Sequence, residues 1–302
     1  MLDVEGDAKD ASDLEDIAAV PSVSGASKGN PSYLALSSKG ILFEVQAVKG
    51  RDGKTVIQTL GSIKIPGGAK ADPDGEFQNY EGLDVESWDA EAGTGTVVMT
   101  FRGGVTKRGP TSADTIRIPM VVKPNGRVSL DTENMVRDKA AQFDGAMSGI
   151  RPAAGVRTSE DRSGHAVLYG VGAQDSEDLD ELKDGHPAKK GFKEGRHASI
   201  LYKQAPGDAT AVVETIVDGH KFEGIDVHDG LVYVVSDDEN QGSTLFKFKS
   251  DGTLLDQHKI TRGTEDQQKK TGISGLAYLP KAAMQKHGGG VRGGRWVPMM
   301  SL

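Results

Sequence analysis

The chain has 302 residues, no cysteine, 40 glycines and a formal net charge of −8 at neutral pH. The absence of cysteine excludes disulfides, thiolate metal sites and cysteine nucleophiles, and the acidic balance argues against a nucleic-acid-binding surface. The many glycines suit a chain with numerous tight turns between short strands.

No stretch approaches the roughly 18 consecutive apolar residues that a membrane-spanning helix needs, so we expect a soluble protein that does not enter the membrane. Residues 1–16 are acidic and lack an apolar core, so no signal peptide is visible. The compartment stays open: cytoplasmic as written, or periplasmic or secreted with a leader removed. We expect a monomer.

A short phrase returns along the chain: an aromatic or aliphatic residue, then Glu, then a small or acidic residue, then a branched apolar residue. Its clear copies are Leu14-Glu15-Asp16-Ile17, Tyr80-Glu81-Gly82-Leu83 and Phe222-Glu223-Gly224-Ile225, and its weaker copies are Ile150-Arg151-Pro152-Ala153 and Ile273-Ser274-Gly275-Leu276. Recurrence at intervals of about 50 to 70 residues, in units of strands and turns, is typical of β-propeller blades.

Each of the first four units reads as four strands joined by polar turns, several of the hairpin-forming Asp-Gly or Asn-Gly type. The fifth unit has strand patterns only near its two ends. The sequence therefore predicts an all-β fold: a β-propeller with five blades, the last irregular, and with six blades as the alternative. In chain order the expected strands are 17–20, 33–36, 42–48 and 55–65; 83–87, 96–101, 115–122 and 127–130; 153–157, 166–171, 198–202 and 211–216; 223–227, 231–236, 243–249 and 253–260; 276–279 and 295–299.

We expect residues 1–302 to form one propeller domain with three less regular parts. Residues 1–11 are expected to be a mobile N-terminus, and 284–302 an irregular C-terminal segment. Residues 174–196 form a charged insertion, with acids in its first half and lysines in its second. It is too charged to be buried, so it is interpreted as a surface loop.

The first strand of every propeller blade lines the central channel, so residues at equal repeat positions form one ring. Three carboxylates in such a ring repel one another unless a positive charge lies among them. Either a hard cation, Ca²⁺ with Mg²⁺ as the alternative, or the Arg151 guanidinium meets this need, and the two can coexist. The expected ring is Glu15, Glu81, Arg151, Glu223 and Ser274; the candidate metal ligands are Glu15, Glu81 and Glu223, with Asp16, Asp237 and Asp238 behind them.

The loops after each second strand return to the end of the propeller where the first strand began. They bring Arg102, Asp237 and Asp238 beside the ring, and His220 lies three residues before Glu223. Such a mouth suits a small anionic or ester substrate together with a cation. The catalytic candidates are Glu223 or His220 as the base, with Arg151 and Arg102 beside them.

The segment from Phe222-Glu223-Gly224-Ile225 through Ser236-Asp237-Asp238 resembles a group of propellers that includes the esterase-like phytases, the SdiA-regulated proteins and an uncharacterised bacterial family. Asp13-Leu14-Glu15-Asp16-Ile17 is also similar to the calcium-binding strand of paraoxonase-type lactonases. The third unit departs from the pattern with Arg151-Pro152. The resemblance implies a propeller with a polar central mouth and does not transfer an activity.

Two function classes follow. The first is a metal-dependent hydrolase of a phosphoester, lactone or related ester, with its site at the mouth of the channel. The alternative is a non-catalytic propeller that binds a ligand or protein partner on the same face, through its carboxylates and Arg151. An enzyme needs an open coordination position and a base within reach, whereas a binding module needs only complementary charge. We favour the hydrolase.

Overall fold

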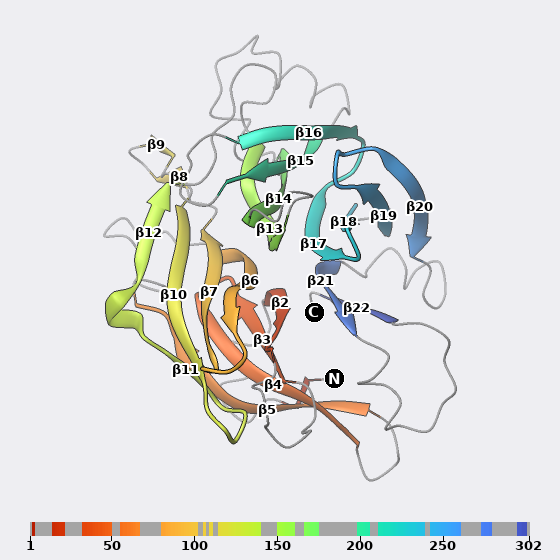
Figure 1. Ribbon diagram of the computed structural model, residues 1–302. Coiled ribbons are helices and arrows are strands. Elements are labelled where there is room, and N and C mark those ends of the chain that lie inside the picture. The colour runs from red at the N-terminus through yellow and green to blue at the C-terminus, as the bar shows by residue number, and fades with distance from the viewer. Residues whose placement is uncertain are drawn as a thin grey trace.

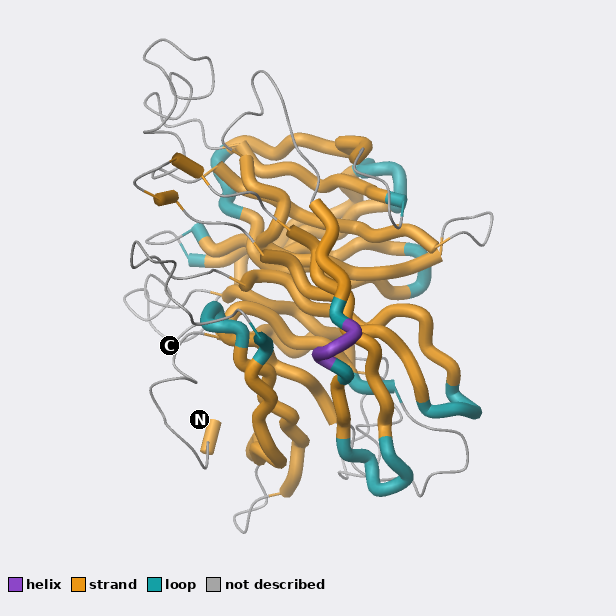
Figure 2. Tube along the Cα trace, turned by 90° about the vertical axis from the view of Figure 1, so that its left-hand side faces the viewer, coloured by secondary structure: helices purple, strands orange, loops and turns teal. Residues whose placement is uncertain are grey.

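The computed structural model describes residues 2–3, 14–21, 32–49, 55–66, 80–101, 105–106, 109–110, 114–139, 150–160, 166–174, 198–205, 211–238, 242–260, 273–279 and 295–300. Most of these residues are in strands, and the sheets are arranged around a common centre (Figure 1). The turned view shows the short helical segment η1 (Thr132–Asn134), in purple, in front of the strands (Figure 2). No helix in the described part of the chain is long and apolar enough to cross a membrane.

Four sheets are blades of antiparallel strands in chain order, with two variations. The short β1 (Leu2–Asp3) adds to blade 1 parallel to β5, and the outer strand of blade 2 is divided into β11 and β12. Blade 1 is β2 (Leu14–Ala19), β3 (Ser32–Ser37), β4 (Ile41–Lys49) and β5 (Thr55–Lys64); blade 2 is β6 (Tyr80–Asp89), β7 (Thr94–Phe101), β10 (Asp114–Val122), β11 (Val128–Leu130) and β12 (Val136–Lys139); blade 3 is β13 (Ile150–Glu160), β14 (Ala166–Gln174), β15 (Ala198–Gln204) and β16 (Ala211–Asp218); blade 4 is β17 (Phe222–His228), β18 (Leu231–Asp237), β19 (Ser243–Lys249) and β20 (Leu254–Ile260).

A two-stranded sheet, β21 (Ile273–Leu279) and β22 (Arg295–Met300), lies between blade 4 and blade 1. The inner strands β2, β6, β13, β17 and β21 contact one another in turn, and β21 contacts both β17 and β2 (Figure 1). The remaining strands, β8 (Val105–Thr106) and β9 (Gly109–Pro110), form a small hairpin. The all-β propeller expected from the sequence is therefore confirmed.

The described residues form four blades rather than the expected five or six; two of these sheets have four strands and two have five. The fifth repeat unit contributes only the β21–β22 pair within the described ranges. Residues 175–197 and most of 1–13 and 280–302 lie outside the described residues, although β1 falls in the expected mobile N-terminus and β22 in the expected irregular segment.

The repeated phrase marks a β-bulge at the start of the inner strands. In blades 1, 2 and 4 and in the β21–β22 sheet, the register shifts by one residue at the second position of the phrase. Blade 3 shifts later, between Pro152 and Gly155. A bulge leaves one residue without a cross-strand partner and re-aims its side chain. The residues in this position are Glu15, Glu81, Glu223 and Ser274.

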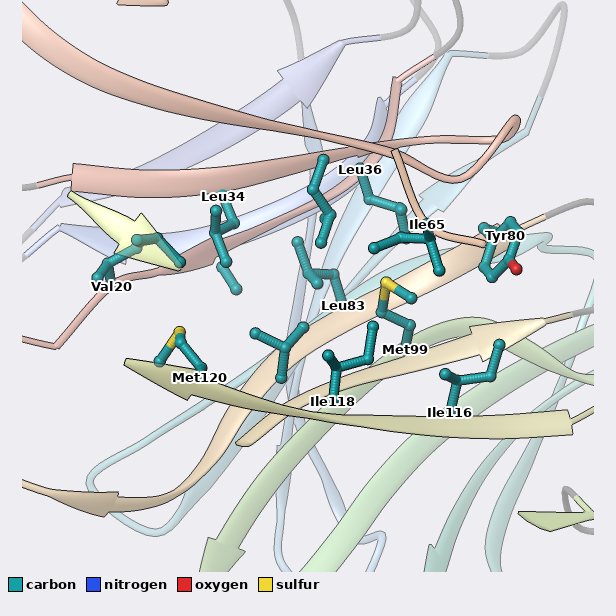
Figure 3. Packing of buried hydrophobic residues seen from close by; sticks show 14 of the residues in the cluster. Val20, Leu34, Leu36, Ile65, Tyr80, Leu83, Met99, Ile116, Ile118 and Met120 are labelled. Carbon is teal, nitrogen blue, oxygen red and sulfur yellow. The ribbon is translucent and has the colours of Figure 1, made fainter. Parts of the chain in front are cut away.

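The apolar core lies between neighbouring blades, where alternate residues of facing strands meet. Between blades 1 and 2 it contains Leu34, Leu36, Leu83, Met99 and Ile116, all fully buried (Figure 3). A second cluster lies between blades 3 and 4. It includes Tyr169, Val171, Leu201, Phe222, Ile225, Phe246 and Phe248. Burial of these faces holds adjacent blades in register.

A glycine in a turn of blade 4 lies very close to the main chain of blade 3. Gly252, in the β19–β20 turn, has φ +77, and a Cβ added to it would lie 2.5 Å from the main-chain oxygen of Glu214 in β16. Gly126, in the turn of blade 2, has φ +80 but nothing within 4 Å of its would-be Cβ. Both positions therefore require a left-handed backbone, but a side chain at Gly252 would also meet Glu214 of the neighbouring blade.

Replacing Gly252 by Ala is therefore expected to destabilise the protein more than replacing Gly126 by Ala. Both variants carry the strain of a left-handed backbone, roughly 1–2 kcal/mol. Gly252→Ala adds a clash with Glu214, which we expect to cost about 1 kcal/mol or more. Urea denaturation of the two variants measures the difference, and equal losses would contradict the close packing of blades 3 and 4.

Candidate functional site

The bulge positions place Glu15, Glu81 and Glu223 at equivalent points of three inner strands. Glu81 is buried, and Glu15 and Glu223 are partly buried. The side chains of Arg151 and Ser274 lie outside the described set, although their strands are described, and Arg102 lies outside the described residues altogether. Arg151 differs, because it pairs in register with Ala173 and the shift of blade 3 comes after it. The ring of five side chains stays a prediction.

Asp16 joins blade 1 to blade 2. It is fully buried, and its two carboxylate oxygens accept hydrogen bonds of 2.8 Å from the main-chain amides of Ile17 and Leu83. Leu83 belongs to β6, so the second bond crosses the blade boundary. These bonds direct both oxygens of Asp16 to main-chain groups, which gives this residue an architectural role.

Glu223 forms an ion pair with Lys221, whose Nζ lies 3.0 Å from Glu223 Oε1. The Lys221 side chain is 32% exposed and that of Glu223 12% exposed, so the ammonium neutralises a carboxylate that is mostly removed from water. At blade 4 the Lys221 ammonium thus balances the charge of the Glu223 carboxylate.

The aromatic residue before the bulge is a packing residue in blade 2. Burial raises the pKa of the Tyr80 phenol, and Arg137, whose Nη2 donates to Tyr80 Oη at 3.2 Å, opposes the shift. The phenol is therefore neutral at physiological pH and is no base.

His220 and Asp238 are brought together at the end of blade 4 where β17 begins and β18 ends. His220 Nδ1 lies 2.8 Å from Asp238 Oδ2, and the imidazole packs edge-on against Phe246 at 4.8 Å between ring centroids. The Asp238 side chain is 8% exposed and that of His220 27% exposed. The pair therefore has a buried carboxylate and an imidazole that reaches the surface.

The Asp238 carboxylate is held by several donors besides His220. Ser236 Oγ donates to Oδ2 at 3.0 Å, and the Lys221 amide donates to Oδ1 at 3.2 Å. Ser236 Oγ in turn accepts from the Thr244 amide at 3.1 Å. Donors to the ionised form stabilise the carboxylate and fix its plane.

This arrangement determines which nitrogen of His220 carries the proton. A carboxylate only accepts hydrogen bonds, so Nδ1–H donates to Asp238 and the neutral ring has its lone pair on Nε2. Among the described residues, Nε2 has no hydrogen-bond partner. An imidazole with this tautomer, a carboxylate behind it and a free Nε2 has the geometry of a general base.

The His220–Asp238 pair occurs in only one repeat unit. At the position two residues before the strand-opening residue, the five units carry Ser12, Gln78, Ser148, His220 and Thr271. At the position of Asp238, two residues beyond the cross-strand partner, they carry Lys39, Gly103, Ser176, Asp238 and Leu302. Blade architecture therefore does not require the pair.

Sequence reasoning named His220 and Asp238 but assigned them to different roles, as base and as metal ligand. It missed Ser199, Ser236 and Lys221, which hold the pair in place. The break in the repeat at position 220 was visible in the sequence, whereas the equivalent of position 238 in each unit follows only from the strand pairing.

The described residues contain no group of three or more His, Asp or Glu side chains that could hold a metal ion. Glu223 contacts Lys221, Asp238 contacts His220, and Asp16 accepts from main-chain amides. The metal ligands named from the sequence and the calcium ion stay predictions.

Comparison with known proteins gives low structural similarity. No protein-family model and no curated protein sequence matches the chain. An exo-β-1,3-galactanase from Clostridium thermocellum aligns over 94% of the chain and 62% of its own at 10% identity and a TM-score of 0.41. A Trypanosoma rangeli sialidase in complex with 2,3-difluorosialic acid aligns over 89% and 42% at 11% identity, with a TM-score of 0.43. Drosophila Semaphorin 2a aligns over 95% and 53% at 8% identity, with a TM-score of 0.38.

The chain spans less than two thirds of the length of each of these structures. At such scores the similarities say nothing of activity, and the propeller assignment follows from the order and pairing of the strands in this chain. The resemblance to the esterase-like phytases and the paraoxonase-type lactonases has no family match behind it.

Replacing Asp16 by Ala is expected to lower the free energy of unfolding by about 1–3 kcal/mol, because it leaves the buried amide of Leu83 without this acceptor. Asp256 on the outer strand β20 is a matched control. Its Oδ1 also accepts from the following amide, at 2.9 Å, but its side chain is 52% exposed. Asp256→Ala is expected to change stability by less than about 0.5 kcal/mol. Urea denaturation tests both, and equal effects would remove the inter-blade role of Asp16.

Proposed function

We propose that the protein is a hydrolase of an ester, in the class of phosphoesters, lactones and related esters, with His220 as its general base. The observation that carries the proposal is the His220–Asp238 pair, with Nδ1 held at 2.8 Å and Nε2 free among the described residues. Its occurrence in one repeat unit alone supports a role beyond blade architecture.

The chemistry follows from the tautomer. Nε2 of His220 accepts a proton from a water molecule as the water oxygen attacks the carbonyl carbon or the phosphorus of the substrate. The bond from that centre to the leaving oxygen breaks, and the imidazolium returns the proton to the leaving oxygen. Asp238 stabilises the imidazolium and keeps the ring oriented, as a carboxylate does in catalytic triads.

Lys221 favours an anionic substrate at the same place. It is adjacent to His220 in the chain, and its ammonium, held by Glu223 at 3.0 Å, is about one third exposed. An ammonium one residue along the chain from the base attracts a phosphate or carboxylate group on the substrate. The roles expected of Arg102 and Arg151 stay predictions.

One observation supports the non-catalytic alternative: the carboxylates of Glu223 and Asp16 already have partners within the protein. Glu223 is already paired with Lys221, and Asp16 already accepts from two amides, so neither needs a reaction to explain it. On this alternative, the same face binds a ligand or protein partner through charge alone. A binding module would not depend on the protonation state of His220.

Replacing His220 by Gln is expected to lower turnover of a competent ester substrate by about 100-fold or more, because general-base catalysis contributes at least that factor. Asp238→Asn is expected to act in the same direction, since an amide can present its donor to Nδ1 and reverse the tautomer. The assay is a panel of phosphoester, lactone and carboxyl-ester substrates, measured as kcat and KM.

His258→Gln is the matched control for this assay. His258 Nε2 lies 2.8 Å from Asp256 Oδ2 in the same blade, but on the outer strand and with a side chain that is 71% exposed. Turnover by His258→Gln should equal that of the wild type. Equal loss in both histidine variants, or turnover that survives in His220→Gln, would argue against His220 as the base.

Calcium at the bulge glutamates is tested by thermal melting. If Glu15, Glu81 and Glu223 hold Ca²⁺, millimolar calcium should raise the Tm over that in EDTA, because a ligand that binds only the native state stabilises it. Glu81→Gln should abolish the shift and Asp256→Asn should retain it. Identical melts of the wild type in calcium, magnesium and EDTA would remove the ion from the proposal and leave the His220 chemistry standing.

A further inference from the structure

Every main-chain polar group from the carbonyl of His220 to the amide of Phe222 has a hydrogen-bond partner. The Lys221 amide donates to Asp238 Oδ1, and the Lys221 carbonyl accepts from the Asp237 amide at 2.8 Å. The other two groups, the His220 carbonyl and the Phe222 amide, contact one hydroxyl. That hydroxyl is Ser199 Oγ.

Ser199 belongs to blade 3, whereas the segment that it holds opens blade 4. Its Oγ donates to the His220 carbonyl at 2.6 Å and accepts from the Phe222 amide at 3.0 Å. The residue is fully buried at the start of β15. One hydroxyl therefore clamps both sides of Lys221 from across the blade boundary.

At the boundary between blades 1 and 2, the amide that opens the inner strand has a different kind of acceptor. Tyr80 opens β6 as Phe222 opens β17, and its amide donates to the main-chain carbonyl of Ser38 at 3.0 Å. A carbonyl only accepts hydrogen bonds, whereas a hydroxyl accepts and donates at once. The hydroxyl therefore satisfies the strand-opening amide and has a proton left for the residue two positions earlier. In blade 4 that residue is His220.

We infer that Ser199 is a positioning residue, through which blade 3 sets the place of the His220 imidazole against Asp238 in blade 4. The inference rests on the proposed hydrolase function for its catalytic consequence, but not for its geometry. The main chain of His220 is fixed by Ser199, and its ring is fixed by Asp238 and Phe246. Without the hydrogen bond from Ser199 Oγ, the main chain that positions the His220 imidazole is no longer held from blade 3.

The test compares Ser199→Ala and Ser199→Cys with Ser37→Ala. A thiol fills nearly the same space but is a weak donor, so Ser199→Cys keeps the packing and loses the strong bond. Ser37 is also fully buried, and its Oγ accepts from the Ile41 amide at 3.2 Å inside blade 1, far in sequence from the base. It controls for the loss of a buried serine hydroxyl.

Both Ser199 variants are expected to lower kcat by about tenfold or more with KM changed by less than about twofold, because displacing a base affects the transition state more than binding. Ser37→Ala should lower stability and leave kcat unchanged. Wild-type kcat in folded Ser199→Ala or Ser199→Cys would overturn the inference.

A second readout does not depend on turnover. The ¹⁵N chemical shifts of the His220 imidazole, assigned with His220→Gln, report which nitrogen is protonated. The wild type should show one neutral tautomer with the proton on Nδ1, and the Ser199 variants a mixture, while Ser37→Ala should match the wild type. An unchanged tautomer in the Ser199 variants would overturn the inference even if the esterase is real. A mixed tautomer in a protein that cleaves none of the esters would sustain the inference and reject the proposed function.

Discussion

The arrangement of the blades depends on the main-chain amides that open the inner strands, because these groups lie away from water and must be hydrogen-bonded. The Tyr80 amide finds its acceptor on Ser38, the Phe222 amide on Ser199, and the Leu83 amide on Asp16. In each case the acceptor belongs to the preceding blade. A buried amide without an acceptor costs about 1–3 kcal/mol, so these bonds specify how one blade meets the next.

The repeated phrase at the start of the inner strands supplies both these hydrogen-bonded amides and a buried aromatic side chain. Tyr80 and Phe222 occupy the same repeat position, and both are fully buried between blades, Tyr80 against Phe101 and Phe222 against Phe246. The residue that follows each aromatic is the bulged Glu81 or Glu223, which the bulge re-aims away from the regular alternation. An aromatic anchor followed by a re-aimed carboxylate explains why the phrase recurs with the blades.

The candidate site lies at the boundary where the residues around the start of the inner strand differ from those of the other blades. At the boundary of blades 3 and 4 the acceptor is a hydroxyl, the residue two positions before the strand is a histidine, and the facing loop carries Asp238. Each change is local, but together they turn a structural boundary into a buried carboxylate with an imidazole in front of it. The His220–Asp238 pair thus depends on two blades: both side chains come from blade 4, and Ser199 of blade 3 holds the main chain of His220.

Much of the fold could be predicted from the sequence, because strand periodicity and turn residues are local signals. The runs around residues 231–236 and 243–249 alternate clearly and became β18 and β19, and the phrase around Glu223 located the start of an inner strand. Within the described ranges, the phrase at residues 273–276 marks an inner strand, β21, that has one paired strand, β22. β12 was missed because its exposed residues show no apolar alternation.

By itself, the sequence determined that the chain is an all-β repeat protein and that carboxylates recur at one repeat position. These properties depend on the order and type of neighbouring residues. Only the tertiary structure decided that Asp16 accepts from Leu83, that Lys221 pairs with Glu223, and that Ser199 reaches His220 from another blade. Such contacts join residues of different strands through directional hydrogen bonds within about 3 Å. Their partners are selected by strand register and blade packing, which no local pattern specifies.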